Sequence, residues 1–148
     1  MWGLGLSPAA ILALALLGVP RVVAHDLGPV GGVPNALLVF VPIAVWLGVV
    51  VWRQVSRPFR TLLAIGLVYG VLVGVAHQLL WPWAFEIPPR LGGNLAGALS
   101  PIAESAVLRL FAFGSSVLTG LGVGALVGLV GWATLRARGP RTRAGGGA

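Results

Sequence analysis

Long stretches without acidic or basic side chains constrain this chain more than any other feature. Four stretches between its Asp, Glu and Arg residues run for 20 to 26 residues each: 1–20, 27–52, 61–85 and 110–135. A helix needs about 20 predominantly apolar residues to cross the hydrocarbon core, where an ionised side chain is costly. The gap at 91–103 is too short and is broken by glycines and by Pro101. The sequence therefore predicts an all-α, polytopic integral membrane protein with four transmembrane helices.

The predicted helices form one transmembrane domain over 1–136, arranged as an antiparallel bundle. Their expected bounds are about 4–24, 35–53, 61–82 and 105–136. The segments are continuously apolar, without the alternation of barrel strands. We expect Pro42 to kink the second helix, whereas Pro8 and Pro20 fall near the ends of the first, where a proline disrupts less. The remaining residues, 137–148, are predicted to form a disordered basic cytoplasmic tail.

Composition agrees with this class and excludes others. Charged residues make up 9% of the chain and hydrophobic residues 57%, whereas soluble domains carry about 25% charged residues. These values exclude a soluble enzyme, a disordered chain and a nucleic-acid-binding domain, despite the net charge of +7. The absence of cysteine excludes disulfides and thiolate chemistry. Lysine is also absent while Ala, Gly, Val, Leu and Arg dominate, a bias that favours a bacterial plasma membrane.

The arginines indicate the orientation of the predicted bundle. Most of them follow the second or the fourth helix, and these topology anchors are Arg53, Arg57, Arg60, Arg136 and Arg138, with Arg141 and Arg143 in the tail. Cytoplasmic loops carry an excess of arginine and lysine, so both termini are predicted to be cytoplasmic. The acidic residues then share the opposite side: Asp26, Glu86 and Glu104. The basic balance thus indicates orientation in a lipid bilayer, and we expect no nucleic-acid partner.

Small residues recur every four positions in the last two predicted helices. The third carries Gly66, Gly70 and Gly74, and the fourth carries Ala112, Ser116, Gly120, Gly124 and Gly128. This spacing forms a flat groove in which two backbones approach closely. We expect the two runs to meet in an antiparallel hairpin. The longer run drifts by about 160° around its helix, so part of it is predicted to contact another surface, as in a homo-oligomer or with a membrane protein partner.

A few polar side chains lie near the outer ends of the same helices. His77, Gln78, Glu104 and Arg109 are the candidates for an outward-facing polar pocket. In one interpretation His77 relays protons and Arg109 holds an anion, because ionisable residues within membranes often serve function. In the other, Arg109 snorkels or pairs with Glu104, while His77 and Gln78 bond a neighbouring helix. The sequence leaves both interpretations open.

The sequence predicts neither a metal site nor a cofactor. His25, Asp26, His77, Glu86 and Glu104 share the outer side, but none shows a ligand spacing. P-loop, Rossmann and nucleophile-elbow motifs are absent.

The first apolar segment has a second interpretation as a signal peptide cleaved after Ala24. Cleavage would expose an amino group beside His25, a compact copper-type chelate. The missing basic n-region and the nearby Arg21 argue against it.

The turn-rich stretches 28–35 and 82–104 are expected to cover the outer mouth of the bundle, with Asn35 capping the second helix. The favoured function is a non-enzymatic membrane subunit or assembly factor that packs through its glycine faces. The alternative is a transporter or permease component that uses the polar pocket; a membrane enzyme fits the scarcity of polar residues least well.

Overall fold

The computed structural model describes residues 3–28, 30–85 and 87–139. These residues form helices joined by turns: α1 (Pro8–Leu16), α2 (Val19–Leu27), α3 (Gly32–Trp52), α4 (Pro58–Ala84), the short 3-10 helix η1 (Gly93–Leu95) and α5 (Pro101–Ala137). Four segments are long and apolar enough to cross a membrane, with α1 and α2 together making the first. The prediction of an all-helical chain with four such segments is confirmed.

The predicted first helix, 4–24, is two helices in the structure. α1 ends at Leu16 and α2 begins at Val19. Because the helical segment continues to Leu27, Pro20 falls inside it rather than near its end. Pro20 has no N–H to donate to the carbonyl of Leu16, and its ring clashes with that carbonyl. The helix therefore breaks one turn before the proline, where Gly18 N bonds Ala15 O at 3.2 Å.

The other helices begin three or four residues earlier than predicted. α4 and α5 start at Pro58 and Pro101, since a proline at the first helical position loses no hydrogen bond and already has a helical φ. Ser100 caps α5 by accepting a hydrogen bond from Ala103 N at 3.4 Å. The predicted cap at Asn35 is wrong, because α3 starts at Gly32 and the Asn35 side chain instead accepts from Nε of Arg21 at 3.3 Å.

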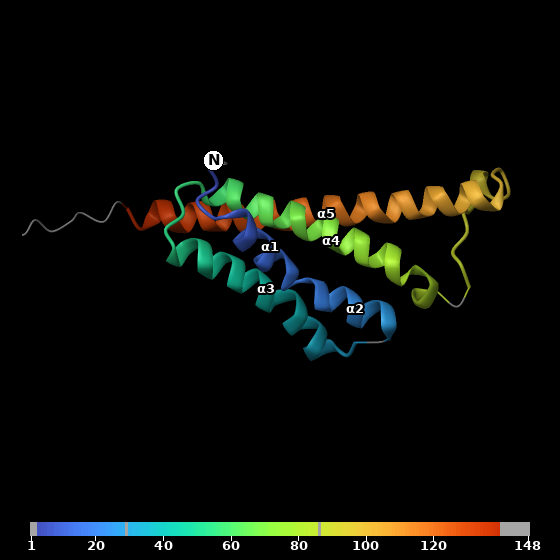
Figure 1. Cartoon of the computed structure of the whole chain (residues 1–148), viewed down its shortest axis with the longest axis horizontal. Coiled ribbons are helices and arrows are strands. Elements are labelled where there is room, and N and C mark those ends of the chain that lie inside the picture. Colours follow the sequence, from blue (N-terminus) through green and yellow to red (C-terminus); the bar gives the residue numbers. More distant parts are fainter. Residues whose placement is uncertain (1–2, 29, 86, 140–148) are drawn as a thin grey trace, which may run out of the picture.

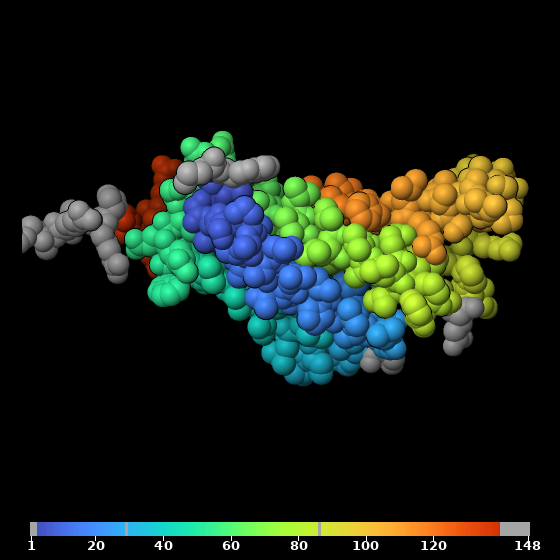
Figure 2. Space-filling view, in the orientation of Figure 1, coloured from blue at the N-terminus to red at the C-terminus, as the bar shows by residue number. Residues whose placement is uncertain are grey.

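The helices lie alongside a long α4–α5 pair (Figure 1). α5 has 37 residues and is therefore about 55 Å long, well beyond the hydrocarbon core of about 30 Å. Figure 2 shows α1 and α2 crossing one face of the molecule between α4 and α3. The α3–α4 turn and the end of α5 lie together at what we call the arginine end, and the α2–α3 and α4–α5 connections lie toward the other, the acidic end (Figure 1).

The core lies in the half of the molecule nearer the arginine end. Its largest fully buried side chains are Trp46, Leu62, Ile65, Val50 and Thr61. Trp46 Nε1 donates to the carbonyl oxygen of Leu14 at 2.6 Å, and this oxygen also accepts from Leu17 N at 3.2 Å at the end of α1. The Trp46 ring also packs edge-on against Tyr69, with centroids 5.4 Å apart. The indole of α3 thus binds where α1 ends.

Large apolar side chains also cover the outside of the molecule. Phe40 on α3 is 66% exposed and Leu118 on α5 is 70% exposed. In water such a surface would favour aggregation. The exposed apolar surface is compatible with a multi-pass membrane protein.

Candidate functional site

The backbones of α4 and α5 touch where their small residues meet. A Cβ added to Gly70 would lie 2.8 Å from the carbonyl oxygen of Ser116, and one added to Gly120 would lie 2.6 Å from Cα of Gly70. A Cβ on Gly124 would likewise lie 2.8 Å from the carbonyl oxygen of Leu62. All these distances are below those of real Cβ contacts, so only glycine allows this separation of the two helices. The contact uses van der Waals packing between backbones, which apolar lipid cannot replace.

Phenylalanine rings extend the contact at both ends. A Cβ on Gly74 would lie 2.6 Å from Cδ2 of Phe113, and one on Gly128 would lie 3.0 Å from Cδ2 of Phe59. Residues later in α4 therefore contact residues earlier in α5, so the two helices run in opposite directions along this contact. Within this chain the small residues from Ser116 to Gly128 are buried against α4, and a Cβ on Gly128 would also lie 3.1 Å from the carbonyl oxygen of Phe59. The prediction that part of the longer run contacts another surface stays a prediction.

Gln78 and Arg109 meet at the far end of the α4–α5 contact. Nε2 of Gln78 donates to the carbonyl oxygen of Arg109 at 3.1 Å, and Arg109 Nη1 donates to Oε1 of Gln78 at 3.5 Å. The guanidinium carbon of Arg109 lies 5.0 Å from the ring centroid of Trp81. Such a cation–π contact adds to the hydrogen bonds. These contacts join the two helices where the small residues end.

His77 contacts a different helix. Its Nδ1 lies 2.6 Å from Oδ2 of Asp26 on α2, so an imidazole protonated on Nδ1 donates to the carboxylate. The Asp26 side chain is only 5% exposed, and its other oxygen, Oδ1, lies 3.2 Å from Nδ1 of His25. Asp26 thus links two imidazoles at the acidic end.

The sequence did not predict that Asp26 contacts His77. The predicted first helix stopped at residue 24, whereas α2 continues to Leu27. Val22 packs with Val73 and Ala76 in a small cluster, and Asp26 lies four residues further on the same helix face. This spacing brings the carboxylate to His77, one residue after Ala76. No local sequence pattern indicated this contact, because the burial of Val22 follows from tertiary packing.

Glu104 stabilises the α4–α5 connection. Its Oε1 accepts a hydrogen bond from the backbone N–H of Leu91 at 2.6 Å. Across the described ranges of the chain, the ion pairs are those of Asp26 with His25 and His77. The pairing of Arg109 with Glu104, which one interpretation of the sequence predicted, is absent there. The four pocket candidates therefore divide among three separate contacts. Glu86, Arg141 and Arg143 lie outside the described residues.

In the part of the chain that the structure describes, no three His, Asp or Glu side chains lie close enough together to hold a metal ion. Within the same residues, every buried side-chain nitrogen and oxygen has a hydrogen-bond partner. The proposed cleavage point after Ala24 lies inside α2. Asp26, His77, Gln78, Glu104 and Arg109 at the acidic end are thus engaged with one another and with backbone groups.

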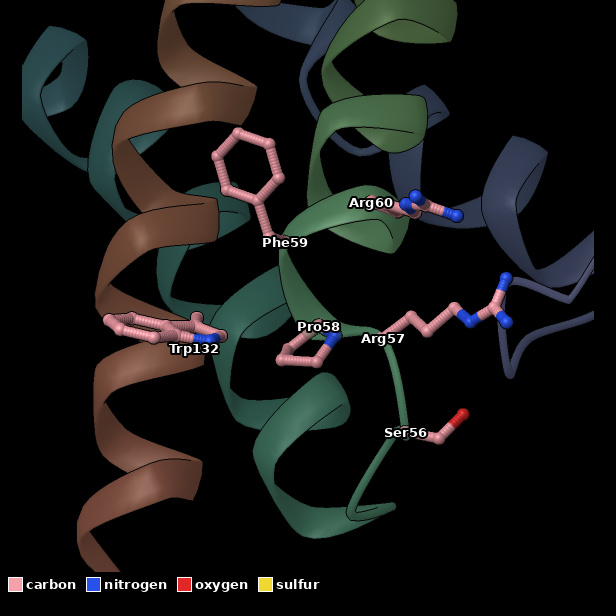
Figure 3. A pocket seen from close by; sticks show the side chains of 6 residues that line it. All are labelled: Ser56, Arg57, Pro58, Phe59, Arg60 and Trp132. Atoms are coloured by element: carbon pink, nitrogen blue, oxygen red, sulfur yellow. The ribbon is translucent and has the colours of Figure 1, made fainter.

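Two hollows lie at the arginine end. One, of about 360 Å³, is lined by the start of α4 and by α5: Ser56, Arg57, Pro58, Phe59, Arg60 and Trp132 (Figure 3). The other, of about 1000 Å³, lies between the N-terminal segment, α1 and α4, and its α4 wall is Ala64, Leu67 and Val68. None of the four pocket candidates lines either hollow.

The topology anchors occupy different settings at this end. Arg53 lies 5.6 Å from the ring centroid of Trp52, and Arg136 lies 5.1 Å from that of Trp132. Arg57 precedes α4 and Arg60 is in its first turn rather than in a loop. Arg138 follows α5.

Comparison with known proteins identifies no relative: no protein-family model, curated protein or solved structure matches this chain.

Proposed function

We propose that this chain is a non-enzymatic subunit or assembly factor of a bacterial plasma membrane. In this proposal it spans the bilayer as an antiparallel four-helix bundle with both termini in the cytoplasm. Support comes from the four apolar segments and from the arginines gathered at one end, Arg53, Arg57, Arg60, Arg136 and Arg138. The glycines between α4 and α5 fix the bundle internally and are buried there, so a partner must bind elsewhere.

The observation that carries the proposal is the outer face of α5. Seven small or apolar residues lie within about 40° of one line along this helix, opposite Gly120: Val107, Phe111, Gly114, Leu118, Gly122, Ala125 and Leu129. Phe111 is 76% exposed, and a Cβ on Gly114 or Gly122 would meet nothing within 4 Å. When helices pack in membranes, large side chains of one helix fit into the space beside glycines of the other. We infer that a transmembrane helix of another subunit, or of a second copy, packs on this face.

The contacts at the acidic end favour this structural role over transport. His77, Gln78, Glu104 and Arg109 each bond another part of the fold. Such hydrogen bonds hold helices together within membranes. A transporter path would need these groups free to meet a substrate, so the transport alternative predicts loss of transport, with an intact fold, in His77→Ala or Arg109→Ala.

Co-purification from native membranes tests the proposal. The wild-type chain, extracted in polymer nanodiscs with its surrounding lipid, should retain a stoichiometric membrane protein or a second copy. Gly122→Leu should lose it, because the new side chain fills the space beside the helix. Gly48→Leu is the matched control, since Gly48 on α3 is also open within 4 Å.

Two results would contradict the proposal. One is a wild-type chain that is monomeric and carries no protein partner in the nanodisc. The other is equal loss of the partner in Gly122→Leu and Gly48→Leu, which would indicate a general effect of added bulk. Helical content and a monodisperse elution profile must be unchanged in both variants.

A further inference from the structure

The apolar hollow at the arginine end is a groove between α4 and the N-terminal segment. Its walls are almost wholly aliphatic or glycine: Gly3, Leu4, Gly5, Leu6, Pro8, Ile11, Leu12, Ala64, Leu67 and Val68, with Ser7 the exception. The Ser7 hydroxyl oxygen accepts a hydrogen bond from Ala10 N at 3.2 Å, which caps α1. The groove thus offers its occupant an apolar surface with little hydrogen bonding. A hydrocarbon chain satisfies this chemistry.

Arg57 and Arg60, which line the smaller hollow, also lie next to one end of this groove. A Cβ on Gly3, a groove residue, would lie 3.1 Å from Nη1 of Arg57. Arg60 lies four and seven residues before Ala64 and Leu67, so it shares the α4 face that forms the groove wall. Figure 3 shows the Arg57 and Arg60 side chains extending to the same side of α4, away from Trp132. From Arg60 to Val68 the groove wall rises about 12 Å along the helix.

These arginines differ from the others at the same end. The guanidinium groups of Arg53 and Arg136 lie over tryptophan rings. Over residues 3–28, 30–85 and 87–139, neither Arg57 nor Arg60 has a carboxylate partner or an aromatic ring beneath it. Asp26 and Glu104 lie at the acidic end. The two guanidinium groups therefore have donors free for an anion, and guanidinium binds phosphate through paired hydrogen bonds.

We propose that this groove binds one anionic phospholipid. The phosphate lies between Arg57 and Arg60, and one acyl chain follows Ala64, Leu67 and Val68 beneath the N-terminal segment. The lipid thereby ties that segment to α4, in addition to the hydrogen bond that Thr61 Oγ1 donates to the carbonyl oxygen of Leu4. Charge selects the headgroup and the aliphatic wall selects a long chain, so free phosphate is not the ligand.

Native mass spectrometry of the full chain in detergent tests this site. Titration with dioleoyl phosphatidylglycerol should give one retained adduct at concentrations where dioleoyl phosphatidylcholine gives none. The double variant Arg57→Gln/Arg60→Gln should bind phosphatidylglycerol roughly 30-fold more weakly, as expected for the loss of two interfacial arginines. The control is Arg53→Gln/Arg136→Gln, which removes the same charge at the same end and should retain the adduct.

A second variant tests the groove without changing charge. Leu67→Trp should fill the space beside α4 and abolish the adduct, whereas Leu118→Trp, on the exposed outer face of α5 and away from the groove, should not. Inorganic phosphate should neither form an adduct nor compete with the lipid. Equal retention of both lipids would overturn the proposal, as would equal weakening in the two arginine double variants. Retention of the adduct by Leu67→Trp would overturn the placement of the acyl chain.

Discussion

Asp26 illustrates how a single carboxylate is accommodated near an apolar bundle. Its side chain is 5% exposed and contacts His77 at 2.6 Å. Burying a carboxylate is costly unless hydrogen bonds or opposite charge compensate. Here two imidazoles, from His25 and His77, are within reach. Because His77 belongs to α4, this contact also holds α2 against the central helices.

His77→Ala should destabilise the fold by about 1–2 kcal/mol, because it removes the closer partner of a buried carboxylate. His25→Ala is the control. The His25 side chain is 70% exposed and lies farther from Asp26, so this variant should lower the free energy of unfolding by no more than about 0.5 kcal/mol. Unfolding by sodium dodecyl sulfate in micelles, followed by circular dichroism, measures both. Equal stability of His77→Ala and wild type would contradict a structural role for the pair.

At the scale of elements, the α4–α5 hairpin depends on glycines that face each other's backbones. Gly70→Leu should prevent the native contact and cost about 3 kcal/mol or more, since the new side chain meets backbone atoms that cannot move aside. A Cβ alone would lie 2.9 Å from Cα of Val117. The same unfolding titration measures this loss.

Gly48→Leu serves as the control for this substitution. It adds the same side chain to α3 in open space, so its free energy of unfolding should remain close to that of the wild type. A Gly70→Leu variant as stable as Gly48→Leu would show that the close backbone approach does not hold the hairpin.

The helices themselves were largely predictable from sequence, and their ends and breaks were not. Long charge-free stretches locate the apolar helices, because the length and composition of such a stretch are enough to identify a helix of this kind. The effect of Pro20 depends on whether the helix continues beyond it, and that continuation depends on Val22 packing against Val73 and Ala76. The contact of Asp26 with His77 follows from the same continuation. Such tertiary information is absent from local patterns.

At the scale of the whole molecule, the arginine and acidic ends define an orientation that can be measured. The chain has no cysteine, so single cysteines can be introduced without background. Ser56→Cys at the arginine end should react with a membrane-impermeant maleimide only in inverted vesicles. Asn94→Cys, in η1, should react in intact cells, because arginine-rich turns remain in the cytoplasm. The reverse labelling pattern would contradict the proposed topology.

We propose that the inner face of α5 closes the bundle while its outer face binds a membrane protein. Site-specific photo-crosslinking in native membranes tests this most directly, with a photoreactive residue at Leu118 on α5 and, as control, at Phe40 on α3. Both positions are well exposed, at 70% and 66%. A discrete protein adduct from Leu118, absent from Phe40, is the predicted result. Lipid adducts alone at both positions would contradict the claim.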